Sequence, residues 1–212
     1  MMRVVAVTMR RVQDPKTAEM RDALSHDWVR LLVRGGMVPL ALPNGLRDAV
    51  AALRGIRAQA LLLTNGEDLG RTSRDRTERQ LLDYAVRARL PVLGVCRGLQ
   101  MINDYFGGDV VPLADHRRFG RHVAVRHEVQ IIGPLRDLLR VDRLRVNSFH
   151  DNGVLMDGVA AELVPGAVAK GGSIEALRHR SLPIWAIQWH PERPGASPRH
   201  DRVLLEHWLR GV

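Results

Sequence analysis

The chain has 212 residues, of which 45% are hydrophobic and 26% charged, a balance typical of one globular domain over residues 1–212. The net charge is +9, but arginines spread along the chain supply it and aromatic residues are only 4%. We therefore expect neither a nucleic-acid nor a membrane partner. A single cysteine excludes an internal disulfide, and no stretch resembles a signal peptide or a membrane span, so we expect a cytoplasmic protein.

The N-terminal half alternates short apolar runs with helical periodicities. Apolar runs separated by helices are typical of a mostly parallel sheet that is covered on both faces. Ser73 is a candidate cap of the third helix. We predict strands over 3–9, 37–43, 58–64 and 91–96, and helices over 18–34, 46–54, 77–90 and 97–106.

The pattern changes after residue 107. Alternating segments at 122–132 and 144–150 indicate antiparallel strands. A buried apolar run returns at 182–193, and 199–212 has the periodicity of a closing helix. The sequence therefore predicts one α/β domain, with a mostly parallel sheet flanked by helices and a small antiparallel β addition.

The only cysteine lies where an apolar run stops and a helix begins. Cys96 stands in the pattern G-x-C-x-G, between Gly94 and Gly98. A nucleophile on a tight strand-to-helix turn is exposed in this way, and small flanking residues let the backbone pass. The amino end of the following helix favours thiolate over thiol. Alone, such a cysteine is better explained as a small buried hydrophobe.

A second motif supplies partners for the cysteine. In "IQWHPER", His190 follows an apolar run and Glu192 stands two residues later, across a proline. A histidine can take the proton of a thiol when a carboxylate fixes its tautomer and orientation. We therefore predict a catalytic triad of Cys96, His190 and Glu192.

These motifs resemble the class I glutamine amidotransferase superfamily, whose members carry a Cys-His-Glu triad on a flavodoxin-like sheet. The segments "GVCRGLQ", "VNSFH", "IEAL" and "IQWHPER" are closest to its γ-glutamyl hydrolase-like branch, the C26 peptidases. The resemblance covers essentially the whole chain. It implies a flavodoxin-like fold, hydrolysis of a γ-glutamyl amide through a thioester on the cysteine, and no cofactor.

The resemblance also assigns roles around the triad. Gly66 matches the position whose backbone N–H forms an oxyanion hole together with the N–H of Arg97, although Asn65 stands where the family often has a second glycine. Gln100 matches a glutamine that faces the γ-glutamyl group. Substrate-side positions of the family correspond to Asn147, Ser148 and His150, and Glu175 matches a glutamate near the site. A structural loop role is an equal alternative for the Asn147–His150 segment.

Three further histidines raise the question of a metal. His116, His122 and His127 are spaced by six and five residues, which fits no familiar zinc pattern, and they have no cysteine partners. His127 matches a family position before the antiparallel segment. We therefore expect no metal from this group.

Three functions remain open after the resemblance. The first is an independent γ-glutamyl hydrolase, the second a glutaminase subunit that passes ammonia to a synthase partner, and the third a scaffold with a relic site. Among hydrolases, the compact chain resembles the γ-glutamyl-CDP-amidate hydrolases of surface-polysaccharide phosphoramidate pathways. A γ-glutamyl amine such as γ-glutamyl-putrescine is the chief rival substrate. A homodimer stays open. Arginines that could meet a nucleotide-linked substrate are Arg71, Arg117, Arg118 and Arg121.

Overall fold

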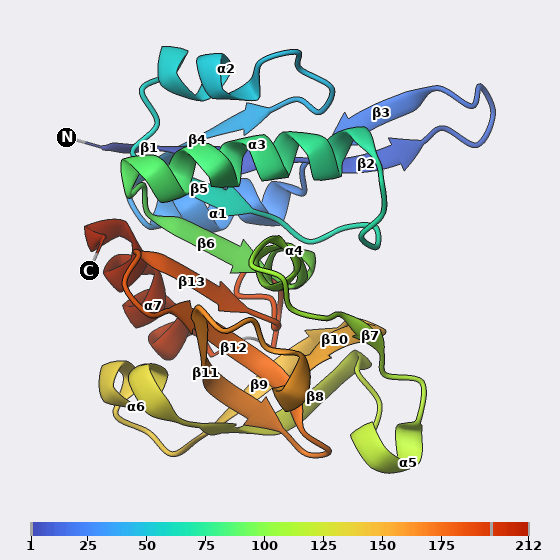
Figure 1. Ribbon diagram of the computed structural model, residues 1–212, viewed down its shortest axis with the longest axis vertical. Helices are drawn as coiled ribbons and strands as arrows, with labels where there is room; N and C mark the ends of the chain where they lie inside the picture. Colours follow the sequence, from blue (N-terminus) through green and yellow to red (C-terminus); the bar gives the residue numbers. More distant parts are fainter. Residues whose placement is uncertain (1, 196, 212) are drawn as a thin grey trace.

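The computed structural model describes residues 2–195 and 197–211. Five parallel strands lie side by side in one half of a long sheet, with short apolar segments that are buried on both faces at its centre (Figure 1). Their order is that of a flavodoxin-like sheet. From the edge inward they are β4 (Met37–Leu42), β1 (Arg3–Thr8), β5 (Ala60–Leu63), β6 (Val92–Val95) and β13 (Ile184–Ile187).

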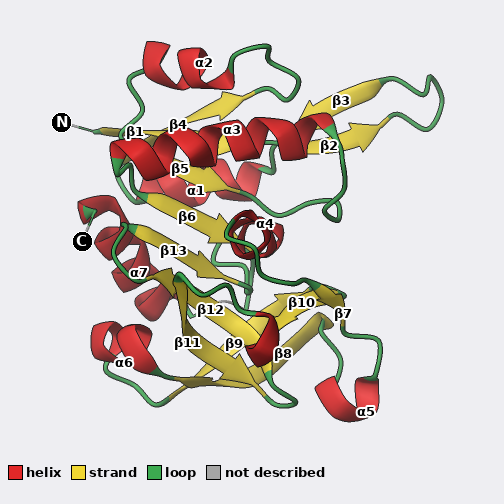
Figure 2. Ribbon diagram, viewed as in Figure 1, coloured by secondary structure: helices red, strands yellow, loops and turns green. Residues whose placement is uncertain are grey.

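Helices cover the two faces of the sheet and divide the core into two layers (Figure 2). Trp28, Leu32 and Trp208 fill the layer on one face, and Leu81 and Leu99 are in the layer on the other. The first layer lies under α1 (His26–Arg34), α6 (Gly133–Leu139) and α7 (Pro198–Arg210), and the second under α2 (Ala49–Gly55), α3 (Ser73–Ala88) and α4 (Arg97–Tyr105).

The sheet continues beyond β13 with antiparallel strands, which confirms the predicted fold class. In order from β13 these are β12 (Ser173–His179), β11 (Leu163–Ala169), β8 (Val123–Ile131) and β9 (Arg143–Phe149). Off this path, β10 (Asn152–Leu155) pairs with β12 and with β7 (Val111–Pro112). Short turns complete this half, α5 (His116–Phe119) and a 3-10 turn (Met156–Gly158).

The N-terminal half differs from the prediction at the starts of two helices, of which α3 is capped by Thr72 rather than by Ser73. The expected helix over 18–34 begins only at His26, where the Ser25 side chain accepts a hydrogen bond from the Asp27 N–H. The preceding residues form a separate hairpin, in which β2 (Arg10–Gln13) pairs with β3 (Met20–Ala23). The part of the chain with described coordinates contains no helix that is both long and apolar enough to span a membrane.

Candidate active site

Cys96 forms the turn between β6 and α4. Its backbone has φ 55° and ψ −105°, a conformation that non-glycine residues adopt only under strain. The strain is held by neighbouring structure, since the Cys96 N–H donates to the Ile187 carbonyl at 2.8 Å and α4 starts immediately afterwards. The predicted strand-to-helix turn is therefore present.

The two glycines of the motif allow this turn to pack. A Cβ atom on Gly94 would lie 2.5 Å from the Gly98 carbonyl oxygen, and one on Gly98 would overlap the Leu63 carbonyl oxygen at the end of β5. A larger residue at either position would thus push α4 away from the sheet. The glycines fix the distance of the Cys96 turn from the neighbouring strand.

The thiol itself is buried, with 6% of the residue exposed. Burial raises the pKa of Cys96 to about 12, although the backbone N–H of Arg97 acts in the opposite direction. The expected effect of the helix amino end on the thiolate is therefore present but smaller than the effect of burial. Without substrate, Cys96 is a thiol and needs a base to become a nucleophile.

His190 and Glu192 follow β13, the strand that pairs with β6 in parallel. The His190 Nδ1 lies 2.8 Å from the Glu192 Oε1, and both side chains are 1% exposed. This contact places the hydrogen of neutral His190 on Nδ1 and leaves a lone pair on Nε2, a buried atom without a hydrogen-bond partner in the described chain. Burial lowers the pKa of His190, with Glu192 opposing it. A neutral imidazole with a free Nε2 can accept a proton.

Asn147 holds His190 in place. The Asn147 Oδ1 accepts from the His190 N–H at 2.8 Å, and its Nδ2 donates to the His190 carbonyl at 2.8 Å. Asn147 is 1% exposed. Its amide is thus engaged with the backbone of His190 rather than directed at a substrate.

The two predicted oxyanion-hole residues are joined by a buried ion-pair network. Arg97 binds the carboxylates of Asp75, at 2.6 Å, and Glu78. Glu78 also accepts from Arg74 Nε at 2.8 Å. Burial would raise the pKa of Glu78, but the two guanidinium groups hold it below its usual range.

Arg74 extends the network to the loop that contains Gly66. Its guanidinium donates to the carbonyls of Thr64, at 2.6 Å, and Asn65, at 3.2 Å. Gly66 has φ 156°, and a Cβ atom there would overlap the Arg74 side chain. Sequence reasoning missed this network because charged residues on a helix usually face solvent. The available signal was that Arg74 and Glu78 continue the stripe of buried residues on α3 that includes Leu81.

A further set of contacts joins Gln100 of α4 to the start of β10. Gln100 is 4% exposed, and its Nε2 donates to the Asn152 carbonyl at 2.9 Å. Asn152, the first residue of β10, in turn donates to Asp68 at 2.8 Å, so the loop after β5 is connected to the start of β10. This contact joins residues that are 84 positions apart in the chain.

Ser148 and His150 lie in a histidine cluster rather than on an open surface. The Ser148 hydroxyl donates to the His122 carbonyl at 2.6 Å, and His150 Nε2 lies 3.1 Å from His122 Nδ1. Glu175 is fully buried beside them. Burial alone would raise the pKa of Glu175, but His127 and His150 lower it to about 2. His116 is exposed and bonds to the Gly120 carbonyl.

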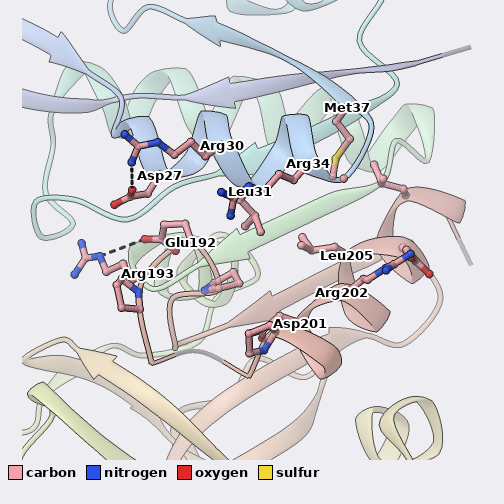
Figure 3. Close-up of a pocket in the computed structure, with 16 residues that line it drawn as sticks. Asp27, Arg30, Leu31, Arg34, Met37, Glu192, Arg193, Asp201, Arg202 and Leu205 are labelled. Carbon is pink, nitrogen blue, oxygen red and sulfur yellow. Dashed lines mark hydrogen bonds and ion pairs between the residues drawn. The ribbon is translucent and has the colours of Figure 1, made fainter.

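A cavity of 710 Å³ lies between α1, α7 and the segment 191–194. In Figure 3 Glu192 and Arg193 project from this segment near Arg30 of α1 and are joined by the ion pair of 3.3 Å. Neither Cys96 nor His190 lines this cavity. The cavity therefore lies beside the Glu192 carboxylate and not over the thiol.

Comparison with known proteins places the chain in a family. The model of the Peptidase C26 family matches residues 3–192, so the chain belongs to the Peptidase C26 family, a group of hydrolases within the class I glutamine amidotransferase-like proteins. The chain is 29% identical over 215 residues to the gamma-glutamyl-CDP-amidate hydrolase of Campylobacter jejuni, covering 97% of this chain and 96% of that protein.

The chain is also similar to two further proteins, one by sequence and one by structure. Anthranilate synthase component 2 of Methanothermobacter marburgensis is 35% identical over 122 residues, which is 57% of each chain. The crystal structure of a glutamine amidotransferase from Methylobacillus flagellatus superposes with a TM-score of 0.66 at 14% identity, covering 99% of this chain and 95% of that one. This structure shows the shared fold.

Proposed function

We propose that the chain is a cysteine-dependent hydrolase that cleaves a γ-glutamyl amide through a thioester on Cys96 and releases glutamate. The observation that carries the proposal is that the paired parallel strands β6 and β13 end side by side. Cys96 follows β6 in a strained turn, and His190 follows β13 with Nδ1 bonded to Glu192 and Nε2 free. A nucleophile, a base and an orienting carboxylate are the parts this chemistry needs.

The reaction follows from the states of these groups. As the Cys96 sulfur attacks the γ-carbonyl carbon, its proton passes to His190 Nε2, because a buried thiol does not ionise unaided. The backbone N–H groups of Gly66 and Arg97 hold the oxyanion. Collapse breaks the C–N bond, and His190 gives its proton to the leaving nitrogen. Water, deprotonated by His190, then hydrolyses the thioester to glutamate and free thiol.

Several residues act on this centre indirectly in the proposal. Asn147 fixes the backbone of His190 through two hydrogen bonds. Gln100 lines the region of the γ-glutamyl group and shares the Asn152 carbonyl with His150, so Ser148 and His150 support that region from the buried histidine cluster. An amino-acid head group carries two charges that such an enclosed site must pair, so the glutamyl half is recognised tightly.

The substrate that we favour is γ-glutamyl-CDP-amidate. It is supported by the similarity to the Campylobacter jejuni enzyme over nearly the full length of both chains and by exposed Arg117 and Arg118 on α5. A γ-glutamyl amine such as γ-glutamyl-putrescine is less suited to an arginine-rich rim, since its product is cationic. The second function, ammonia delivery to a synthase partner, is supported by the similarity to anthranilate synthase component 2.

Glutamate release by the purified chain tests these alternatives. Wild type and Cys96→Ala would be incubated separately with γ-glutamyl-CDP-amidate, γ-glutamyl-putrescine and glutamine. We expect the first to be hydrolysed fastest, without a partner chain, and Cys96→Ala to be inactive on all three. Fast release from γ-glutamyl-putrescine would support the rival substrate, and release from glutamine alone would support the glutaminase. Full activity of Cys96→Ala would contradict the proposed chemistry.

A further inference from the structure

Four side chains that can bind a metal converge inside the antiparallel half of the sheet. His122 precedes β8, His127 lies on β8, His150 follows β9 and Glu175 lies on β12. The side chains of His122, His150 and Glu175 are at most 2% exposed, and that of His127 is 18% exposed. Because they come from three distant parts of the chain, at β8, after β9 and on β12, spacing along the sequence does not reveal the whole group.

Backbone carbonyls fix the tautomers of two of these histidines. His122 Nε2 lies 3.0 Å from the Phe119 carbonyl, and His150 Nδ1 lies 2.9 Å from the Asn152 carbonyl. A carbonyl only accepts, so each of these nitrogens bears a hydrogen. In the neutral rings the other two nitrogens, His122 Nδ1 and His150 Nε2, are then lone pairs that face each other at 3.1 Å. Two facing lone pairs require a positive group between them.

The Glu175 carboxylate and His127 Nε2 also need a positive group beside them. Glu175 Oε1 lies 3.7 Å from His122 Nδ1 and 3.6 Å from His150 Nε2, and Oε2 lies 3.6 Å from His127 Nε2. Glu175 Oε2 and His127 Nε2 are buried and have no hydrogen-bond partner among the described residues. A proton shared by His122 and His150 would satisfy that pair, and His127 Nε2 and Glu175 Oε2 would then have only each other, at 3.6 Å, which is beyond hydrogen-bond distance.

We propose that His122, His127, His150 and Glu175 together bind one divalent transition-metal ion of the zinc class. Imidazole nitrogens and a carboxylate oxygen are suitable ligands for such an ion. With bonds of about 2.0–2.1 Å, ligand atoms around a tetrahedral ion lie about 3.3 Å apart. The separations given above, with Glu175 Oε1 facing His122 and His150 and Oε2 facing His127, range from 3.1 to 3.7 Å. The ligand atoms of His122, His127 and Glu175 all lie within 4.8 Å of one another, and His150 joins this group through His122 and Glu175, so binding requires the four side chains to draw together around the ion.

The site is structural in this proposal. Four protein ligands fill a tetrahedral shell and leave no position for a reacting water. The carbonyls of Phe119 and Asn152 orient two of the imidazoles, the usual arrangement around a metal-binding histidine. The ion would join β8, β12 and the end of β9. Since Cys96 and His190 are not ligands, the site can exist whether or not the chain hydrolyses γ-glutamyl amides.

Metal content and melting temperature test the proposal with the full chain. The protein would be purified once without chelator and once after unfolding with chelator and refolding with Zn²⁺ or Co²⁺. We expect one ion per chain, a tetrahedral Co²⁺ absorption spectrum, and a melting temperature that Zn²⁺ raises and chelator lowers. For His127→Gln we expect the affinity for Zn²⁺ to fall by about 100-fold or more. His116→Gln, at an exposed histidine outside the group, should bind as wild type does.

His127→Gln is the decisive variant because His127 is the most exposed of the four and its loss leaves the His122–His150 contact intact. Circular dichroism would confirm that it folds. Wild type that melts at the same temperature with Zn²⁺ and with chelator, and holds no stoichiometric ion after refolding, would overturn the proposal. So would a folded His127→Gln that binds Zn²⁺ as tightly as wild type. Either result would mean that His122 and His150 share a proton and that the cluster binds no metal ion.

Discussion

At the scale of single residues, the resting state of Cys96 is decided by burial. The sequence pattern indicates a nucleophile at a helix amino end, and the turn, the flanking glycines and the nearby Arg97 N–H are all present. The pattern does not show how far the thiol is withdrawn from water. That property depends on the loops packed over it, which come from distant parts of the chain.

The first prediction concerns the reactivity of Cys96 without substrate. A thiol whose pKa is raised to about 12 is almost fully protonated near neutral pH, so its thiolate fraction rises about tenfold with each pH unit. Alkylation of Cys96 by iodoacetamide should therefore accelerate steadily between about pH 7 and about pH 10. Mass spectrometry of the alkylated peptide measures the rate. A plateau near neutral pH would show a thiolate already paired with His190.

The second prediction separates the roles of His190 and Glu192. His190→Ala removes the base and should lower kcat by about 10²- to 10⁴-fold. Glu192→Gln should be milder, because glutamine can still accept from Nδ1. Glu192 raises the pKa of His190, so its loss should lower that pKa further. The acid limb of kcat/KM, where His190 becomes protonated, should then move to lower pH. A greater loss for Glu192→Gln than for His190→Ala would reverse the assigned roles.

At the scale of elements, apolar patterning predicted the parallel strands well because the central ones, β5, β6 and β13, are buried on both faces. It failed at β3, where Met20–Ala23 has no strand pattern and pairs only with the exposed β2. It also failed at Arg74 and Glu78, because the amino-acid pattern of a buried ion pair does not differ from that of a solvent-exposed one. For the site, motifs gave the candidate residues, but the inward contacts of Asn147 depend on tertiary packing.

The third prediction concerns the start of α3, where the sequence suggested Ser73 as the cap and the structure has Thr72. The Thr72 hydroxyl accepts from the Asp75 N–H, and Asp75 accepts from the Thr72 N–H at 2.8 Å, a capping box. Thr72→Ala should lower the free energy of unfolding by about 1 kcal/mol. Ser73→Ala is the matched control and should change it little. Urea denaturation measures both, and equal losses would contradict the assignment of the cap.

At the scale of the whole molecule, we propose that the exposed arginines of α5 select the leaving group by their charge. The net charge of +9 is spread widely, but Arg117 and Arg118 are exposed on α5, whose residue Phe119 contacts the histidine cluster through its carbonyl. A leaving group with phosphates would be attracted there and a cationic amine repelled. Selection by exposed charges should weaken as salt rises, since screening acts within about 10 Å at about 0.1 M.

The fourth prediction tests this selection by charge reversal. In Arg117→Glu/Arg118→Glu, kcat/KM for γ-glutamyl-CDP-amidate should fall, while that for a neutral γ-glutamyl anilide should stay within about twofold, because exposed charges act weakly on neutral groups. The control is Arg54→Glu/Arg57→Glu, which changes net charge equally at exposed positions in and just after α2. If both double variants reduced the two activities alike, rim charge would not be the basis of selection.

The central claim is that glutamate leaves through a thioester on Cys96, and trapping that intermediate tests it most directly. Wild type mixed with excess γ-glutamyl substrate would be quenched in acid within the first turnover, and the peptide that contains Cys96 would be examined by mass spectrometry. We predict a mass increase of one γ-glutamyl group on that peptide, removed by hydroxylamine and missing in Cys96→Ala. Glutamate release by wild type with the label on another residue, or release by Cys96→Ala at the wild-type rate, would contradict the account.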